Sequence, residues 1–477
     1  CGSSTIHNRI CGSQSAIYGP QKCLWDMGDP QRSDPAGRRA CGLRRRGGGM
    51  SAGDGEGFAI DPTKVRAWKR YPAYKDSGVE WLGEVPAGWD IKKLAWITKC
   101  LDGKRIPLNT EERGRIQGQF PYWGANSVVD YIDKWLFDEP LVLLGEDGAP
   151  FFEPYKDVAF YVQGKIWVNN HAHVLRATKV DPRYLAHSLN AVDFRPYING
   201  STRDKLTQAE MNSILIPYPI ITEQHVIAAF LDRETARIDA LIEKKQRFIE
   251  LLEEKRQAVI THAVTKGLDP DAEMKDSGVE WIGEVPVDWE VKKLKHVFKN
   301  FDSRRIPINS EDRGKLEKIY PYYGASGIID YVDDYIFDEP LILVAEDGAN
   351  LLSRSTPLAF VAEGRYWVNN HAHILKPRRG NLIYWEGALQ SFDYTPLISG
   401  AAQPKLTTEK LSTIVLPLPP IEAQNEISHF IKQEGCHINS LNDFIRRQIE
   451  KLEELRTALI SAAVTGKIDV RGEGGAA

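Results

Sequence analysis

Two histidines separated by one residue, His171 and His173, are the side chains whose spacing first suggests chemistry, and they recur as His371 and His373. On a strand, residues i and i+2 lie on the same face, so the two rings could ligate one metal ion. A third ligand at a regular spacing is missing. The sequence therefore favours two other interpretations equally: a polar turn that stabilises a domain, or a loop that faces nucleic acid.

Two neighbouring carboxylates, Glu146 and Asp147, recur as Glu346 and Asp347 and could be an acid–base pair. Gly148 follows them, and Asp-Gly is a strong turn signal, so we interpret both as turn residues. The sequence contains no phosphate-binding loop, dinucleotide-binding glycine motif, methyltransferase motif, nucleophile elbow or His-Glu-x-x-His zinc motif. No recognisable motif would hydrolyse ATP or hold a methyl donor.

Basic, amide and aromatic side chains recur at matched places between predicted strands. Arg, Lys, Asn and Gln hydrogen-bond to base edges, and Arg and Lys also neutralise phosphates. Any one of these residues could belong to an ordinary solvated loop, but the recurrence of the set favours DNA contact. The candidate DNA-binding residues of the first copy are Lys104, Arg105, Arg113, Arg115, Trp123, Asn126, Lys165, Asn169, Asn170, His171, His173, Arg203 and Lys205. Those of the second copy are Arg304, Arg305, Arg313, Lys315, Tyr323, Ser326, Arg365, Asn369, Asn370, His371, His373, Gln403 and Lys405.

Charge does not decide the partner class. The chain carries a net charge of −4, and residues 1–49 hold eight Lys and Arg against three Asp and Glu, which leaves −9 for the remainder. A net negative body argues against nonspecific nucleic-acid binding, although a specific reader can gather its basic residues on one face. Residues 1–49 show no hydrophobic period, and we expect a disordered tail or translated upstream sequence there.

The elements that must position these residues come from a duplication. From Asp61 onward the chain is two copies of one unit offset by 200 residues: Lys75–Trp81 recurs as Lys275–Trp281, and Trp167–His173 as Trp367–His373. Each copy begins with a Trp- and Pro-rich segment. The pattern that follows predicts short strands and a short helix, near Pro182–Leu189 in the first copy. A proline-extended segment then leads into a long helix.

The two long helical runs, Thr222–Val264 and Ala423–Val464, show an apolar seam every seven residues with charged residues on the other faces, as in a coiled coil. The seam positions are Ile238, Lys245, Leu252, Val259, Ile438, Ile445, Leu452 and Leu459. A weaker d-type seam begins at Leu241, and Thr222 is the expected N-cap. Neither helix can bury its seam alone. We therefore expect the two helices to pack antiparallel and to relate the halves by a pseudo-twofold axis.

The order of these motifs, present twice over about Asp61–Asp469, resembles the specificity subunits of type I restriction–modification enzymes. The resemblance is carried by the KDSGVEWxGEVP lead-in, the Tyr-Trp/Tyr-Gly-Ala run, VNNHAH, the Lys-Leu-Thr…Ile-Pro-x-Pro exit and the end of each long helix. It implies an α+β fold with two duplicated α/β target-recognition domains separated by two long antiparallel coiled-coil helices. The expected segments are 1–49 (disordered), 61–219 (first recognition domain), 220–268 (first central helix), 269–419 (second recognition domain), 420–469 (second helix) and 470–477 (disordered tail).

The resemblance also implies a function without catalysis in this chain. The chain would bind bipartite double-stranded DNA and assemble with two modification subunits, which use S-adenosylmethionine to methylate adenine, and with restriction subunits, which use ATP and Mg. It would hold no cofactor or metal of its own. No apolar run is long enough to span a bilayer, and a body with only Cys100 and Cys436 is typical of a reducing cytoplasm. The resemblance implies that this cytoplasm is bacterial or archaeal. The alternatives are a protein-binding coiled-coil scaffold and a metal-dependent enzyme using His171 and His173.

Because the two copies are so alike and the helices should be antiparallel, we further expect a target with related, inverted half-sites, close to an interrupted palindrome. Differences between the half-sites should follow the positions where the copies differ. These positions are Trp123/Tyr323, Asn126/Ser326, Ser127/Gly327, Lys165/Arg365 and Arg203/Gln403.

Overall fold

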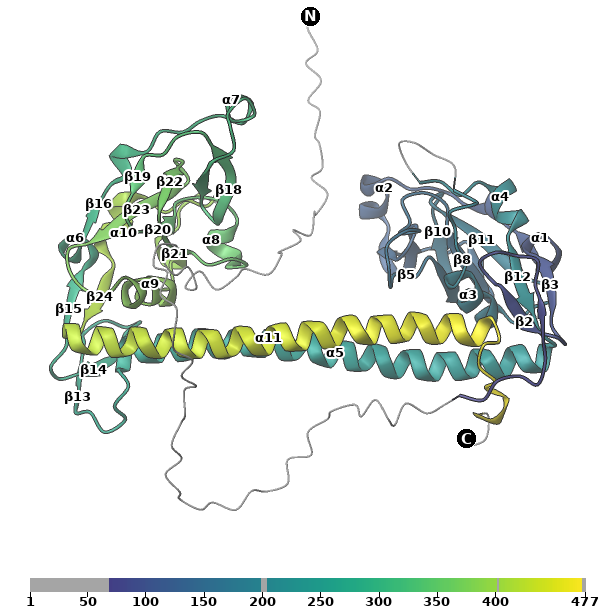
Figure 1. Cartoon of the computed structure of the whole chain (residues 1–477). Coiled ribbons are helices and arrows are strands. Elements are labelled where there is room, and N and C mark those ends of the chain that lie inside the picture. Colours follow the sequence, from purple (N-terminus) through teal and green to yellow (C-terminus); the bar gives the residue numbers. More distant parts are fainter. Residues whose placement is uncertain (1–67, 199–203, 401–402, 474–477) are drawn as a thin grey trace, which may run out of the picture. The chain divides into compact units, whose positions relative to one another are not determined.

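The computed structural model describes residues 68–198, 204–400 and 403–473 (Figure 1). The segment 1–49 that we expected to be disordered lies outside the described residues. The described part contains two similar domains, β1 through β12 and β13 through β24, each followed by a long helix. No helix within it is both long and apolar enough to cross a membrane.

The first domain contains two four-stranded sheets, in the orders β6-β5-β10-β7 and β4-β11-β8-β9, and a short hairpin. Its elements are β1 (Tyr74–Asp76), β2 (Glu84–Pro86), β3 (Asp90–Lys93), α1 (Leu94–Ile97), β4 (Thr98–Cys100), η2 (Asp102–Lys104), α2 (Thr110–Arg115), β5 (Gln117–Trp123), β6 (Val128–Ile132), β7 (Phe137–Asp138), β8 (Leu141–Gly145), β9 (Ala159–Val162), β10 (Lys165–Val168), β11 (Ala172–Ala177), α3 (Pro182–Asn190), α4 (Gln208–Ser213) and β12 (Leu215–Tyr218).

The second domain repeats this order, with sheets β18-β17-β22-β19 and β16-β23-β20-β21. Its elements are β13 (Met274–Asp276), β14 (Glu284–Pro286), β15 (Glu290–Lys293), α6 (Leu294–Val297), β16 (Phe298–Asn300), η3 (Asp302–Arg304), α7 (Ser310–Arg313), β17 (Tyr320–Gly324), β18 (Gly327–Val332), β19 (Phe337–Asp338), β20 (Leu341–Ala345), α8 (Asn350–Ser353), β21 (Ala359–Ala362), β22 (Arg365–Val368), β23 (Ala372–Pro377), α9 (Leu382–Ser391), η4 (Thr395–Leu397), α10 (Thr408–Thr413) and β24 (Val415–Leu418).

Strand β8 explains how each domain is layered. Every residue of β8 is buried, and its side chains alternate between two cores because successive residues of a strand point to opposite faces. Leu141 and Leu143 pack against residues of the other sheet. Val142 and Leu144 pack against α3 and the ends of the long helices. Strand β20 divides its residues in the same way in the second domain.

The two long helices, α5 (Ile221–Lys266) and α11 (Ile421–Val464), lie side by side (Figure 1). Asp239 of α5 contacts Arg456 of α11, whereas Glu253, further along α5, contacts Asn442, further back on α11. The pairing therefore runs antiparallel, as the sequence predicted. At about 1.5 Å per residue, each helix is close to 70 Å long.

The first predicted seam of the helix pair is confirmed at its apolar positions, and the second is wrong in α5, although Leu441 of α11 packs against the buried contact. Ile238, Ile438 and Ile445 are buried between the helices. The d-type positions Leu241 and Phe248 are 41% and 49% exposed. Residues four positions after the seam complete more of the contact than those three positions after it, as the buried Asn442 shows. An ordinary helix turns once in 3.6 residues, so spacing four is as close to the seam as spacing three.

The expected N-cap of the first long helix is also wrong. The helix begins at Ile221, one residue before Thr222, and no side chain of the described residues caps it. The buried side chain of Gln224 donates to the carbonyl of Pro219 and accepts from the backbone N–H of Asp181. A tertiary contact therefore fixes the start of this helix in place of a local cap.

Each domain packs on both helices near opposite ends of the pair. The hydroxyl of Tyr184 donates to the carbonyl of Val464, and the hydroxyl of Tyr384 donates to the carbonyl of Val264. The end of α11 thus completes the first domain, and the end of α5 completes the second. These reciprocal contacts give the chain its pseudo-twofold symmetry.

The expected disordered tail from residue 470 needs correction over the part that is described. Val470 is fully buried in the core of the first domain. The guanidinium of Arg471 lies over the ring of Tyr71 and pairs with Asp469. Burying the apolar side chain of Val470 in this core is more favourable than leaving it in water, so the chain is ordered here. Residues 474–477 lie outside the described residues.

Glu386 on α9 provides a test of the second domain. Burial raises the pKa of its carboxyl to about 7, and the matched residue of the first domain is Ala186. In the unfolded chain the carboxyl ionises near pH 4.5, so the free energy of unfolding should fall by about 2 kcal/mol as the pH rises from 4.5 to 7. Urea unfolding at pH 5 and pH 8 should show this loss in the parent chain and not in Glu386→Gln. The exposed Glu409→Gln serves as control, and an unchanged pH dependence in Glu386→Gln would contradict the assignment.

Candidate nucleic-acid interface

Several predicted DNA-binding residues of the first domain gather where four chain segments meet. The β5–β6 turn closes through Gly124 N–H and Ser127 O at 2.8 Å. The Asn169 N–H donates to Trp123 O at 3.1 Å, and the Glu146 N–H donates to His171 O at 2.8 Å. The Leu206 N–H donates to Glu146 O at 2.8 Å. We call this group of segments, Gly124–Ser127, Glu146–Gly148, Asn169–His171 and Lys205, the turn cluster.

The second domain builds the same turn cluster. The Asn369 N–H donates to Tyr323 O at 3.0 Å, and the Glu346 N–H donates to His371 O at 2.9 Å. Asp347 and Lys405 form an isolated antiparallel bridge, as Asp147 and Lys205 do in the first domain. The geometry is therefore a property of the repeated unit.

The two histidines of the His-Ala-His motif do not share a site. His173 lies on β11, is buried, and pairs with Asp102 through Nδ1 at 2.6 Å. His171 precedes the strand, its ring is partly exposed, and its Nδ1 contacts Asp147. The expectation that both rings could face one metal ion fails because β11 begins at Ala172, after His171.

A network of charged side chains lies beneath the turn cluster. Arg105 donates to Glu146 Oε2 at 2.6 Å and to Ala172 O at 2.8 Å. Lys205 pairs with the other oxygen of Glu146 at 3.2 Å. The second ring nitrogen of His173 faces the carbonyl of Leu206 at 2.9 Å. Both ring nitrogens of His173 therefore face acceptors, and an imidazolium satisfies both.

Asp102, Glu146 and His173 are close enough together to hold a metal ion, as are Asp302, Glu346 and His373. In each group, however, an arginine and a lysine already neutralise the carboxylates. A cation would have to displace these charges, so the arrangement fits an ion-pair network better than a metal centre. Its chemical effect is to hold the Asn169–His171 turn from below.

The residues that the turn cluster offers to solvent are a subset of those predicted. Asn126, Asn170 and Lys205 are exposed, and the His171 side chain is 39% exposed. Lys104 is exposed on η2, next to Arg105. Arg105, Asn169 and His173 instead face inward and support the turn, and the matched residues of the second domain do the same.

Other predicted residues lie elsewhere in each domain. Arg113 pairs with Asp130 at 2.9 Å and lies over the ring of Tyr122, so it joins α2 to the sheet. Arg115 pairs with Glu111 on the surface of α2. The Lys165 ammonium lies 3.9 Å from the centre of the Trp135 ring. Arg203 lies outside the described residues.

The second domain follows the same division. The residues placed outward or on exposed loops are Arg304, Lys315, Ser326, Arg365, Asn370, Gln403 and Lys405. The Tyr323 ring packs on Phe360 and Tyr366, and Arg313 pairs with Asp330. Trp123 likewise packs on Phe160 in the first domain. These aromatic rings support the sheet that carries the turn.

Asp102 and Asp302 were missed by the sequence reasoning, although both recur at the period of 200. Burial opposes ionisation of Asp302, but the hydrogen bond and charge of His373, together with hydrogen bonds from Asn300 and the Ile374 N–H, outweigh it and lower the pKa of the carboxyl to about 2. The pKa of Asp102 is also lowered, by its bond to His173, against the opposing effect of burial. A carboxylate two residues after a strand and three residues before a repeated Arg was the available signal.

Asp302→Asn tests this support. The folded-state pKa is below the unfolded value near 3.8, so the ionised carboxylate stabilises the protein above pH 4 and the contribution is lost as the pH falls towards 2. The free energy of unfolding of the variant should therefore be about 2 kcal/mol lower than that of the parent chain at pH 7, and this difference should shrink below pH 3.5. Denaturant unfolding followed by tryptophan fluorescence measures it, with the exposed Asp443→Asn as control. A difference that stays constant down to pH 3 would contradict this role.

Comparison with known proteins identifies the family. A model described as the type I restriction modification DNA specificity domain matches residues 86–251 and 286–454. The MjaVIII specificity subunit of Methanocaldococcus jannaschii is 23% identical over 424 residues, which cover 81% of this chain and 94% of that protein. The EcoDI specificity subunit of Escherichia coli is 20% identical, with 81% of this chain and 90% of that protein covered.

A chain from a solved structure of a type I R-M system shares the fold. It superposes with a TM-score of 0.55 at 16% identity and covers 80% of this chain and 98% of its own length. The two family-model matches fall on the two halves of the duplication and together cover most of the sequence. This chain is therefore a member of the type I restriction–modification specificity subunits, with two target-recognition domains joined by a pair of long helices.

Proposed function

We propose that this chain is a non-catalytic subunit that reads a bipartite double-stranded DNA target and directs modification and restriction subunits to it. Methyl transfer, with S-adenosylmethionine, and cleavage, with ATP and Mg, would belong to those partners in a bacterial or archaeal cytoplasm. The observation that carries the proposal is the presence of the same turn cluster in both recognition domains, which the antiparallel helices relate by a pseudo-twofold axis. Duplex DNA with inverted half-sites has the same symmetry.

The exposed groups of each turn cluster suit DNA. An amide at Asn170, a ring nitrogen at His171 and an ammonium at Lys205 are groups that contact phosphates and base edges. In each domain the ion network holds their backbone, which reduces the conformational entropy that binding would otherwise cost. A protein-binding scaffold without DNA would not need two identical polar turns built this way.

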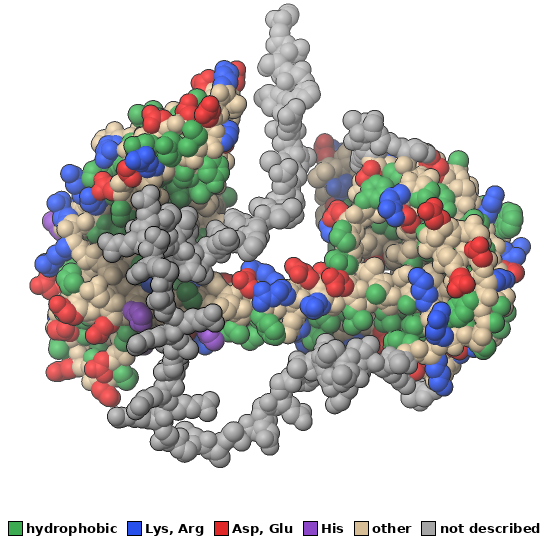
Figure 2. All heavy atoms as spheres, in the orientation of Figure 1, with side chains coloured by type: hydrophobic (Ala, Val, Ile, Leu, Met, Phe, Trp, Pro, Cys, Tyr) green, Lys and Arg blue, Asp and Glu red, His purple; other side chains and the backbone are tan. Residues whose placement is uncertain are grey.

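The helix pair offers a surface for the modification subunits. Leu241, Phe248, Leu251, Phe444 and Leu455 are each 41–51% exposed along the pair. Figure 2 shows hydrophobic side chains reaching the surface along these helices. Large apolar side chains repeated along one element are typical of a protein interface. The proposed occupant is the modification subunits, since the family acts as an assembly.

The target itself should have related half-sites. The copies agree throughout Trp167–His173 and differ at the β5–β6 turn, where Asn126-Ser127 is replaced by Ser326-Gly327. Methylome sequencing of cells that carry this system should show an adenine-methylated motif with two half-sites in inverted orientation that differ at a minority of positions. Cells lacking the gene are the control. Two unrelated half-sites would contradict the near-palindrome, and the absence of a bipartite motif would contradict the function.

The turn that both domains share, at His171 and His371, and the β5–β6 turn, which differs between them, should affect DNA binding in different ways. His171 and His371 stand in identical surroundings, so they fit a contact that both half-sites share, such as a phosphate. His171→Ala with His371→Ala should weaken binding to cognate and noncognate duplexes alike, by about fivefold for each of the two lost hydrogen bonds, and leave the methylated motif unchanged.

Asn126→Ser with Ser127→Gly, which copies the second turn into the first domain, should instead change the preferred base in one half-site. Fluorescence anisotropy of the assembled methyltransferase over a salt series measures both effects, because phosphate contacts make affinity fall with salt. His262→Ala on the exposed face of α5 is the control. A changed motif in the histidine variant would contradict this assignment.

A further inference from the structure

Each recognition domain packs on the helix pair through two contacts that both domains share. We call the surface where a domain meets the two helices its seat. In each, a buried tyrosine, Tyr184 or Tyr384, reaches the last turn of the opposite helix. In each, Gln224 or Gln424 accepts the backbone N–H just before the short helix α3 or α9. The remaining contacts between domain and helices differ between the two seats in whether they are ion pairs.

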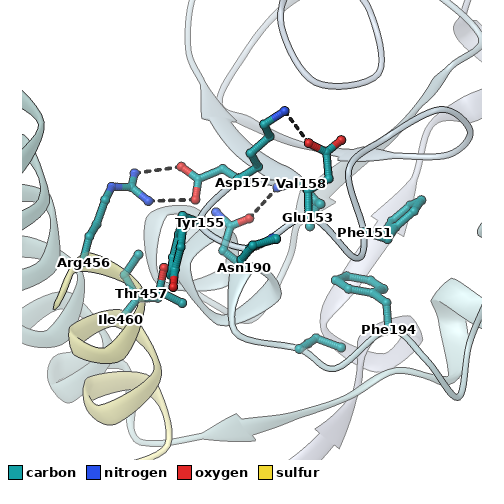
Figure 3. A pocket seen from close by; sticks show the side chains of 13 residues that line it. Phe151, Glu153, Tyr155, Asp157, Val158, Asn190, Phe194, Arg456, Thr457 and Ile460 are labelled. Carbon is teal, nitrogen blue, oxygen red and sulfur yellow. Dashed lines mark hydrogen bonds and ion pairs between the residues drawn. The ribbon is translucent and has the colours of Figure 1, made fainter. Parts of the chain in front are cut away.

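The seat of the first domain contains a three-residue ion cluster. Arg456 of α11 donates through both terminal nitrogens to Asp157 of the first domain, at 2.9 and 2.8 Å (Figure 3). Its Nε donates to Asp239 of α5 at 2.9 Å. One guanidinium therefore ties the domain to both long helices at once. We call Arg456, Asp157 and Asp239 the Arg456 clamp.

The Arg456–Asp157 pair of the clamp is partly shielded from solvent, whereas the Asp239 side chain is 50% exposed. The Arg456 side chain is 17% exposed and that of Asp157 27% exposed. Burial disfavours the charge on Arg456, but the bonds to Asp157 and Asp239 outweigh it and raise the pKa of the guanidinium. Exposed single ion pairs contribute little, whereas partly buried bidentate pairs are stronger and hold a fixed geometry. A cavity of about 150 Å³ lies beside the pair, and Val158, Phe194 and Ile460 of the apolar core also line it.

The matched arginine of the second seat makes no such connection. Arg256 has Pro357 where Arg456 has Asp157, and Asn439 where Arg456 has Asp239. Its terminal nitrogens contact Asn439 and Glu253, both on the long helices. Among the described residues its buried Nε has no hydrogen-bond partner. Arg256 therefore joins helix to helix and leaves the second domain out.

A second set of contacts shows the same difference. His187 and Arg183 of α3 both bind Asp232 of α5, at 2.8 and 3.1 Å. The matched residues of the second seat are Gly387, Ile383 and Lys432, which cannot form these pairs. There, Gly387 packs closely on Ile260 and Ile431, and Ser391 hydrogen-bonds to Thr261 at 3.0 Å. The ammonium of Lys266 donates to the backbone carbonyl of Glu284 at 2.6 Å, and no carboxylate of the described residues pairs with it.

We propose that Arg456 is a positioning residue that sets the orientation of the first recognition domain on the helix pair, and that the matched Arg256 provides no such ion pair to the second domain. Directional ion pairs resist rotation of a domain about its seat, whereas apolar and neutral contacts tolerate small shifts. The two half-sites are then read under unequal restraint. The effect of this difference on DNA recognition rests on the proposed function. The difference between the two seats can be tested without DNA.

Hydrogen exchange on the assembled methyltransferase tests the seats directly. Arg456→Gln should make the peptides of α3 exchange about tenfold faster, the change expected for loss of a partly buried charge-assisted bond. Arg256→Gln, the matched control, should leave the peptides of α9 unchanged. Asp157→Asn removes the clamp from the domain side and keeps the test open if Arg456→Gln does not fold. Unchanged α3 exchange in both clamp variants, or equal loosening of α9 in Arg256→Gln, would overturn the inference.

A spacer series tests the consequence for recognition. Duplexes carrying the motif methylated by the parent complex are made with the native spacer and with one base pair more or fewer, which rotates one half-site against the other. The parent complex and Arg256→Gln should reject the altered spacers. Arg456→Gln should lose about tenfold of that discrimination, as expected when one such bond no longer fixes the angle.

Full discrimination in Arg456→Gln would show that the clamp does not position the domain. If the parent complex prefers no bipartite duplex, the proposed function fails, while the hydrogen-exchange result still decides the difference between the seats. A domain that is simply destabilised would lose affinity on every spacer alike, so that outcome also counts against a positioning role.

Discussion

The antiparallel packing of α5 and α11 is the interaction on which the rest of the structure depends. Each helix exposes an apolar seam that it cannot bury by itself, and the partner helix covers it. The same pairing brings the end of each helix to the domain of the other repeat. Leu459 and Ile460 of α11 complete the core of the first domain, and Ala263 and Val264 of α5 complete that of the second. Neither repeat has a finished core without the other.

This reciprocal construction gives the polar sites their symmetry. The turn cluster lies at the ends of β5, β8 and β10, and β8 also packs towards the ends of the long helices, so this strand connects the helices to the turns. Beneath each turn cluster the same Asp, His, Arg, Glu and Lys residues pair with one another. Burying one such charge unpaired would be costly, and this explains why the whole group recurs together in both copies.

The two halves of the chain are less alike where the domains pack on the helices than they are in the turn clusters. The turns that are proposed to meet DNA are identical over Trp167–His173. At the seats, however, four ionisable residues of the first half are replaced by uncharged ones in the second: Asp157 by Pro357, Asp239 by Asn439, Arg183 by Ile383 and His187 by Gly387. Packing interfaces of equal geometry can be built from either chemistry. They differ in how strongly they resist rotation, and in a molecule with two readers such a difference affects their relative alignment.

Much of this molecule was determined by the sequence alone. The period of 200, the two long helices, their antiparallel pairing and the family all followed from local patterns, because hydrophobic periodicity and repeated motifs are properties of neighbouring residues. The gathering of Asn126, Asn170, His171 and Lys205 into one cluster required the tertiary structure, since these residues come from segments far apart in the chain. So did the separation of His171 from His173, which depended on where β11 begins, and the start of α5, which a buried Gln224 decides. The roles of Arg105 and Arg456 were equally hidden: a basic side chain looks the same in sequence whether it meets solvent, DNA or a buried carboxylate, and only its partners in space distinguish these cases.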